Sequence, residues 1–174
     1  MKTTFFITLV FLFYNMTSCA QTRFTEGVST IGNQKFDITK SSLTVNNKRS
    51  WFVSSQKNKY QGPIPLPKDN YDMPVSKSDI HVDLDKVRSI VYQFLNNKKQ
   101  ELHNKNEKLG MAFKFETNGS LVYVSYTLFE DTIITLADLE QIDTALRQEI
   151  KATFSGQSYD HYIAVDYNFP RITF

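Results

Sequence analysis

An Asn-Gly pair between two runs of alternating apolar residues constrains the fold most. Phe113 and Phe115 alternate with polar residues upstream, and residues 121–129 downstream are rich in β-branched and aromatic side chains. Alternation is typical of a strand with two different faces, and Asn-Gly is the strongest short signal for a hairpin turn. The sequence therefore predicts an antiparallel hairpin. Asn118-Gly119 would be the centre of a type I′ turn, and Phe113 and Phe115 would face the core.

Two stretches have the three- and four-residue apolar spacing of amphipathic helices. The first starts near Asp83 and Asp85, either of which can cap it, and Gly110 is its expected end. The second starts at residues 135–138, which resemble a capping box with Asp in place of Glu, and its apolar stripe runs to Phe154.

Shorter β segments flank these elements. They are predicted at residues 35–38, 43–45 and 50–54, with a last strand at 162–167. We therefore predict an α+β fold, in which an antiparallel sheet of three or more strands packs against two helices. An N-terminal β-hairpin section packs against this sheet or extends it.

The length after the N-terminal segment predicts one domain, residues 21–174. Its expected parts are a β section, a Pro-containing connector and an α-β-β-α-β section (residues 21–61, 62–78 and 79–174). Cys19 is the only cysteine, so no disulfide can form within the chain and a hydrophobic core must stabilise it.

Residues 1–20 have the pattern of a secretory signal peptide. Lys2 precedes an apolar run too short to span a bilayer, and small residues follow it. Two cleavage positions fit: after Ala20 by ordinary signal peptidase, or before Cys19. In the second case residues 16–19 resemble a bacterial lipobox and Cys19 is lipidated. We expect an exported protein of the periplasm or outer membrane, held at a membrane only through a lipid on Cys19.

Charge is distributed unevenly along the chain. Residues 19–68 hold eight basic and two acidic side chains, whereas residues 69–174 carry a net negative charge. The basic residues are scattered and form no stripe with interleaved aromatics, which argues against nucleic-acid binding. Opposite charge in the two halves favours one half packing on the other.

One cluster has the composition of a metal site. On an extended backbone, alternate residues share a face, and nitrogen and oxygen ligands suit zinc or manganese. The alternative interpretation is helix capping, which places Asp before a helix for its own reasons. Capping is the interpretation we favour for this cluster, which comprises Asp79, His81, Asp83 and Asp85.

Other polar residues suggest no catalytic site. Ser158, Asp160 and His161 are close in sequence, but a triad is defined by geometry in space, and no Gly-x-Ser-x-Gly elbow is present. His103 falls on a polar helix end. The glycines form no phosphate-binding loop. We predict no catalytic residue, no cofactor and no metal ligand.

The order helix, strand, Asn-Gly hairpin, strand, helix, strand over residues 84–167 resembles the C-terminal domain of TonB. The similar stretch is residues 113–115, Gly119, Val122 and Val124, followed by a helix and a final strand. This resemblance implies a periplasmic adaptor that binds by strand addition. A cleavable signal and a short Pro-containing loop differ from TonB, which has a retained membrane helix and a long spacer. In general, the chain resembles small exported bacterial proteins of unknown function.

Three functions follow as expectations. The first is a non-enzymatic cell-envelope protein that binds an envelope partner or ligand. The second is a TonB-like adaptor that adds a partner strand to an exposed sheet edge. The third is a metal-dependent hydrolase built on the cluster at residues 79–85.

Overall fold

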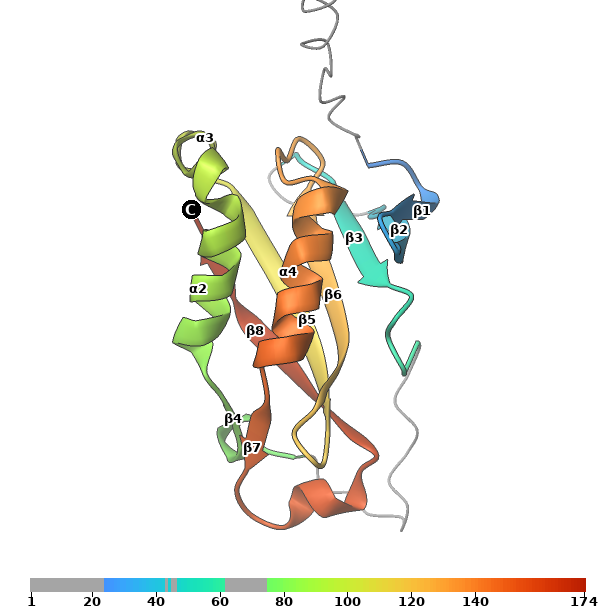
Figure 1. Ribbon diagram of the computed structural model, residues 1–174, viewed down its shortest axis with the longest axis vertical. Helices are drawn as coiled ribbons and strands as arrows, with labels where there is room; N and C mark the ends of the chain where they lie inside the picture. The colour runs from blue at the N-terminus through green and yellow to red at the C-terminus, as the bar shows by residue number, and fades with distance from the viewer. Residues whose placement is uncertain (1–23, 43, 45–46, 62–74) are drawn as a thin grey trace, which may run out of the picture.

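The computed structural model describes residues 24–42, 44, 47–61 and 75–174. The fold is α+β, as the sequence predicts, with an antiparallel sheet of six strands, a second sheet of two strands, and helices on one face of the larger sheet (Figure 1). The predicted signal peptide, Cys19, most of the strand at 43–45 and most of the connector lie outside the described residues.

The six-stranded sheet has the order β1-β2-β3-β6-β5-β8. Its strands are β1 (Gly27–Ile31), β2 (Gln34–Lys40), β3 (Ser50–Ser55), β6 (Leu121–Phe129), β5 (Lys108–Glu116) and β8 (Ala164–Thr173). The small sheet pairs β4 (Ile80–Val82) with β7 (Ala152–Phe154). All of these pairs are antiparallel.

Two longer helices lie side by side over the sheet (Figure 1). The helical elements are α2 (Leu84–Leu95), α3 (Lys99–Asn104), α4 (Leu136–Glu149) and the 3₁₀ turns η1 (Lys77–Asp79), η2 (Asn96–Lys98) and η3 (Ser158–His161). The predicted capping box is confirmed: the Thr135 hydroxyl accepts from the Asp138 backbone N–H, and the Asp138 carboxylate accepts from the Thr135 N–H.

The N-terminal section extends the main sheet. Strand β3 pairs with β6 in the register Trp51 with Leu128 and Val53 with Tyr126. Inward-facing side chains of this section, including Phe36 and Val53, are fully buried in the same core as the helices. Trp51 is also buried, at 9 % exposure.

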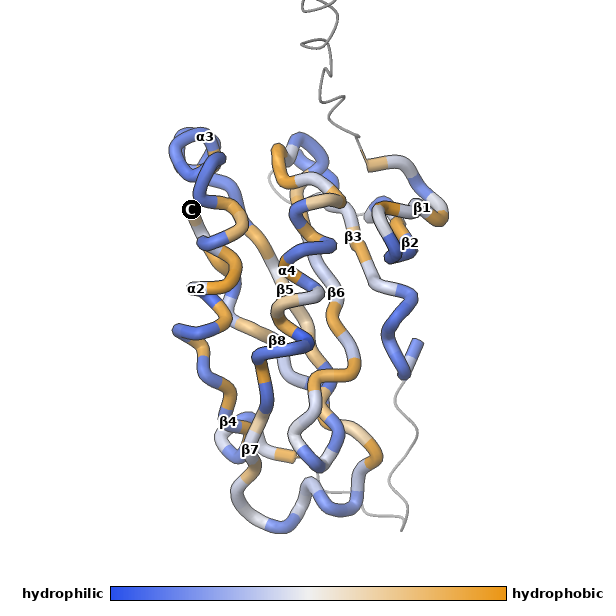
Figure 2. Tube along the Cα trace, in the orientation of Figure 1, coloured by the Kyte–Doolittle hydropathy of each residue, from blue (hydrophilic) through white to orange (hydrophobic). Residues whose placement is uncertain are grey.

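Apolar residues alternate with polar ones along the central strands (Figure 2). Phe113 and Phe115 are at most 1 % exposed, so the predicted core face of the hairpin is confirmed. At the far end of α2, the short α3 is largely hydrophilic (Figure 2), and only Leu102 of α3 is buried.

The first predicted helix ends earlier than Gly110. Helix α3 stops at Asn104, and Asn106 then takes a left-handed conformation with φ of 49°. Asn tolerates this conformation better than most residues other than Gly. Gly110 lies inside β5, where an added Cβ would be 3.2 Å from the Thr127 Cβ, so it is a position of close strand approach.

The second predicted helix also ends early. Helix α4 stops at Glu149, Ile150 is extended, and residues 152–154 form β7 rather than the last helical turn. Ile150 and Ala152 are buried all the same. Because β7 packs on the same core as α4, its apolar residues continue the apolar pattern of the helix. Apolar periodicity alone therefore predicted the end of the helix too late in the sequence.

The hairpin turn is one residue out of the predicted position. The Gly119 N–H donates to the Glu116 carbonyl at 2.8 Å, so Thr117 and Asn118 are the central residues of the turn. Gly119 follows them with φ of 83°, and Asn118 has a negative φ. This is a type I turn followed by a left-handed glycine, the three-residue alternative to a type I′ turn.

Candidate functional site

One cavity lies between the end of α2, α3 and the end of β8, and we call it the helix groove. Its volume is about 540 Å³, within the range of ligand-binding sites in proteins. The lining residues are Tyr92, Leu95, Asn96, Lys99, Gln100, His103, Thr173 and Phe174. Carboxylates are absent from these eight side chains.

The groove follows from the order of elements at this end of the molecule. Helix α2 ends at Leu95, and the 3₁₀ turn η2 redirects the chain into α3, which places Lys99 and His103 on one wall. The rings of Tyr92 and Phe174 meet edge to face at 5.7 Å on the other side. Tyr92 remains 42 % exposed, a large aromatic surface at the rim.

Strand β8 is an edge of the main sheet. At its end the Phe174 N–H donates to the Glu107 carbonyl of the neighbouring chain segment at 3.1 Å. Backbone groups of successive residues alternate in direction along a strand. The N–H and C=O of Thr173 therefore point away from β5, and Thr173 lines the groove. An extended peptide lying in the groove would meet these groups.

The structure does not bring together the four side chains at residues 79–85 that have the composition of a metal site. The strand of this segment comprises residues 80–82 alone, because Asp79 ends the turn η1 and Asp83 is the N-cap of α2. His81 reaches across the small sheet, with Nε2 2.9 Å from the Ser155 hydroxyl. Within the described ranges, no three His, Cys, Asp or Glu side chains are close enough to hold a metal ion.

The two aspartates at the start of α2 have structural contacts. Asp83 is the N-cap and its Oδ1 accepts from the Lys86 N–H at 2.9 Å, whereas Asp85 forms an ion pair with Arg88 at 3.0 Å. The contact of Asp83 agrees with the interpretation that this cluster serves to cap the helix.

The other polar residues considered from the sequence lie in two different places. His103 lines the helix groove. Ser158, Asp160 and His161 all lie in the turn η3, which leads into β8. No local sequence pattern predicts the groove, because its walls come from α2, α3 and β8, and only the tertiary fold brings Tyr92 beside Phe174.

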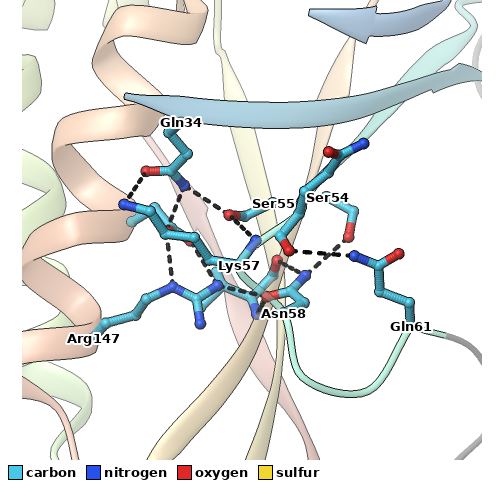
Figure 3. A network of polar contacts seen from close by, with 10 residues as sticks. Gln34, Ser54, Ser55, Lys57, Asn58, Gln61 and Arg147 are labelled. Carbon is cyan, nitrogen blue, oxygen red and sulfur yellow. Dashed lines mark hydrogen bonds and ion pairs between the residues drawn. The ribbon is translucent and has the colours of Figure 1, made fainter. Parts of the chain in front are cut away.

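A network of polar side chains is buried where α4 crosses the N-terminal strands (Figure 3). Asp143 is fully buried and pairs with Arg147 one turn later, with Oδ2 2.8 Å from Nε. Gln34 of β2 donates to the same Asp143 oxygen at 2.6 Å and to the Ser55 hydroxyl at 2.8 Å. Arg147 also donates to Asn58. We call these five residues the polar clip.

Asn58 links the polar clip to the main sheet by hydrogen bonds to the backbone of β6. Its side-chain amide donates to the Val124 carbonyl at 3.0 Å and accepts from the Val124 N–H at 2.9 Å, which continues the β3–β6 ladder with a side chain. Burial, and then the nearby Asp143 carboxylate, raise the pKa of Tyr126 well above its ordinary value. No residue of the clip lines the helix groove, and the hydrogen bonds of the clip join α4 to the N-terminal strands.

Comparisons with known proteins give a fold but no family. No protein-family model matches the chain, and no curated protein matches it. Among solved structures, a DUF5043 family protein from Bacteroides uniformis ATCC 8492 superposes with a TM-score of 0.61 and 14 % identity. The match covers 83 % of this chain and 84 % of that one. At this identity the likeness shows the fold alone, and the function of this chain has to be argued from its own surfaces.

Helices long and apolar enough to cross a membrane are absent from the described part of the chain.

Proposed function

We propose that the protein is a non-enzymatic binding protein of the cell envelope, and that the helix groove is where it binds its partner. The observation that carries the proposal is the cavity of about 540 Å³ beside the outer edge of β8, which pairs with no other strand among the described residues. The envelope location rests on the signal-peptide pattern of residues 1–20.

The composition of the groove favours binding over catalysis. Tyr92, Leu95 and Phe174 supply apolar surface, and the amides of Asn96 and Gln100 supply hydrogen bonds that are not specific to one reaction. Binding sites typically combine apolar walls with a few such polar groups.

An extended peptide of the partner is the occupant that fits best. Its backbone would pair with the outward-facing groups of Thr173, and one side chain would rest on Tyr92. Pairing with an edge strand provides affinity and adjacent pockets provide specificity. Pro170 lacks an N–H and interrupts the edge of β8, which confines such pairing to the last residues of the strand. This mode is the one that the TonB-like topology implies.

Peptides selected from a random library test the proposal. The selected peptides are expected to shift the amide resonances of Asn96, His103 and Thr173, and to slow hydrogen exchange at the Thr173 N–H. Tyr92→Ala should weaken their binding at least about tenfold, because aromatic residues dominate binding energy at such contacts.

Phe52→Ala is the matched control. Phe52 is 46 % exposed on β3 and Tyr92 is 42 % exposed, so both variants remove a similar aromatic surface. Binding that depends on Phe52 and is indifferent to Tyr92 would place the site on the sheet and contradict the proposal.

The envelope location has a separate test. Mass spectrometry of the native protein should find an N-terminus at Cys19 or at Gln21. A start at Cys19 with a lipid modification would assign the lipobox, and Cys19→Ser should then release the protein from membranes. An intact Met1 would contradict export.

A further inference from the structure

Strands β5 and β8 pair through a β-bulge. The ladder shifts between Leu109 and Met111, so Gly110 of β5 alone faces two residues of β8, Pro170 and Arg171. Both β8 residues are exposed, whereas the residues on either side of them are buried. A bulge redirects side chains, and here it turns Arg171 away from the core.

Arg171 reaches the sheet face that lies opposite α2 and α4, which we call the open face. On this face Ser50 is paired with Phe129, and Gly110 with Thr127. Side chains two residues apart share a face, so Lys108 lies beside Phe129 in the same row. Three strands and the bulge thus bring polar side chains to one end of the open face.

These side chains enclose a small cavity of about 90 Å³, roughly the space of three water molecules. It is lined by Ser50, Lys108, Thr127, Leu128, Phe129 and Arg171. A second cavity of about 150 Å³, which includes Lys105 and Asn106, adjoins it and shares Lys108 and Phe129.

The two cations of the first cavity are Lys108 and Arg171. Neither forms a side-chain ion pair or hydrogen bond in the described part of the chain. Two acidic residues lie nearby in the second cavity. Asp131 is paired with Lys48 at 2.8 Å, and Glu107 is 3 % exposed. The residues that line the first cavity therefore include two cations and no carboxylate side chain.

We propose that this cavity is an oxyanion-binding site, with Lys108 and Arg171 as the charged ligands and the hydroxyls of Ser50 and Thr127 as neutral donors. The guanidinium group presents paired N–H donors that match a carboxylate, sulfate or phosphate, and an ammonium group adds a second charge. The site lies on the opposite face of the sheet from the helix groove and does not depend on it.

Phe129 extends the recognition beyond the anion. Phe129 lines both cavities and the Lys48 ammonium lies 5.7 Å from its ring centroid, so a group attached to the oxyanion would lie beside both side chains. An anionic sugar has both a charged group and a face that packs on aromatic rings. A free inorganic anion has the charge alone. The shared chemistry is the oxyanion.

Titration followed by amide resonances tests the site. Sodium sulfate, sodium phosphate and sodium glucuronate are compared with sodium chloride at constant ionic strength. The Gly110, Thr127 and Arg171 amides are expected to shift and saturate with at least one oxyanion and not with chloride. A variant with Lys108→Gln and Arg171→Gln should bind at least tenfold more weakly.

The matched control carries Lys35→Gln and Lys151→Gln, which removes two exposed lysines that have no ion pair in the described ranges. It should bind as the unmodified protein does. Thr127→Val removes one hydroxyl donor at unchanged charge and should weaken binding severalfold. This second variant keeps the test decisive if the double variant unfolds, which a thermal melt reports.

Each outcome decides the inference. Saturation by sulfate or phosphate supports a site for a bare oxyanion, and saturation by glucuronate alone supports a carboxylated sugar resting on Phe129. Linear shifts with all anions would overturn the inference. Equal affinity of the double variant and its lysine control would overturn it as well.

Discussion

The two parts of the sheet are held in different ways. In the C-terminal part, β5 and β6 are nine residues long and pack Phe113, Phe115 and Val124 fully against α2 and α4. In the N-terminal part, β1 has five residues, none of them buried, and Val28 is 62 % exposed.

The N-terminal strands compensate with polar contacts. Gln34, the first residue of β2, and Asn58, three residues after the end of β3, both bond to the Asp143–Arg147 pair of α4. Apolar burial stabilises without regard to direction, whereas a buried hydrogen-bonded pair is favourable only in one arrangement. The comparison indicates that the apolar core stabilises the C-terminal part and that the polar clip fixes where the N-terminal strands attach.

Arg147→Met should have the largest effect. It leaves the carboxylate of Asp143 buried, with Gln34 as its one remaining side-chain partner among the described residues, and an uncompensated buried charge costs about 3–5 kcal/mol. Chemical denaturation measures the loss of stability. Hydrogen exchange should accelerate in β2 and β3 before it does in β5. Uniform acceleration across the sheet would contradict the division of roles.

Gly119→Ala should have the next largest effect and lower the free energy of unfolding by about 2–4 kcal/mol. Gly119 has φ of 83°, and an added Cβ would lie 2.2 Å from the Ala152 carbonyl oxygen, so both backbone strain and a clash oppose the change. Thermal melts measure it.

Gly27→Ala is the control for this variant. Gly27 has φ of 112° but nothing within 4 Å of an added Cβ, so strain acts there without a clash. Its cost should be about 1 kcal/mol. Equal melting temperatures for the two variants would show that the contact between the hairpin turn and β7 does not constrain the C-terminal part.

Glu107→Gln should stabilise the C-terminal part by about 1 kcal/mol near neutral pH. Burial raises the pKa of Glu107, so the folded state holds the proton more tightly than the unfolded state. The contribution of this proton to the free energy of unfolding is therefore lost as the pH rises through the raised pKa of Glu107. The difference between variant and unmodified protein should vanish near pH 4 and grow by pH 8 in denaturation curves. A difference independent of pH would contradict the role of the charge.

Tyr126→Phe should have the smallest effect, within about 0.5 kcal/mol. The hydroxyl of Tyr126 is buried beside Asp143 but has no hydrogen-bond partner in the described residues. Removing it leaves the bonds of the clip in place. A large loss of stability on denaturation would show that Tyr126 belongs to the clip and would extend it into the centre of β6.

Local signals in the sequence predicted the C-terminal part well. The alternation around Phe113, the capping box at Thr135 and the turn near Gly119 act over a few residues, so the class of fold and the hairpin followed from them. The boundary at Phe154 was wrong because apolar periodicity continues when a chain passes from helix to strand along the same core. The boundary at Gly110 was wrong because Asn106 takes the left-handed conformation that was expected of a glycine.

The sites depend on contacts that no local pattern contains. Tyr92 and Phe174 are 82 residues apart and meet only after β8 joins the sheet. The same holds for Gln34 and Asp143, which are 109 residues apart. Cys19 and residues 1–20 remain a prediction from sequence.

The strand order β3-β6-β5-β8 sets the sequence in which the sheet can be completed. Residues 50–55 must wait for residues 121–129, because β6 is the strand to which the first three attach. On a chain made from its N-terminus, the β1–β3 meander therefore emerges well before its docking edge exists. Such distant pairing slows folding and exposes strand edges meanwhile. The hairpin of β5 and β6, closed by a local turn, is the natural nucleus, and the nascent chain would need protection until Phe129 has been added.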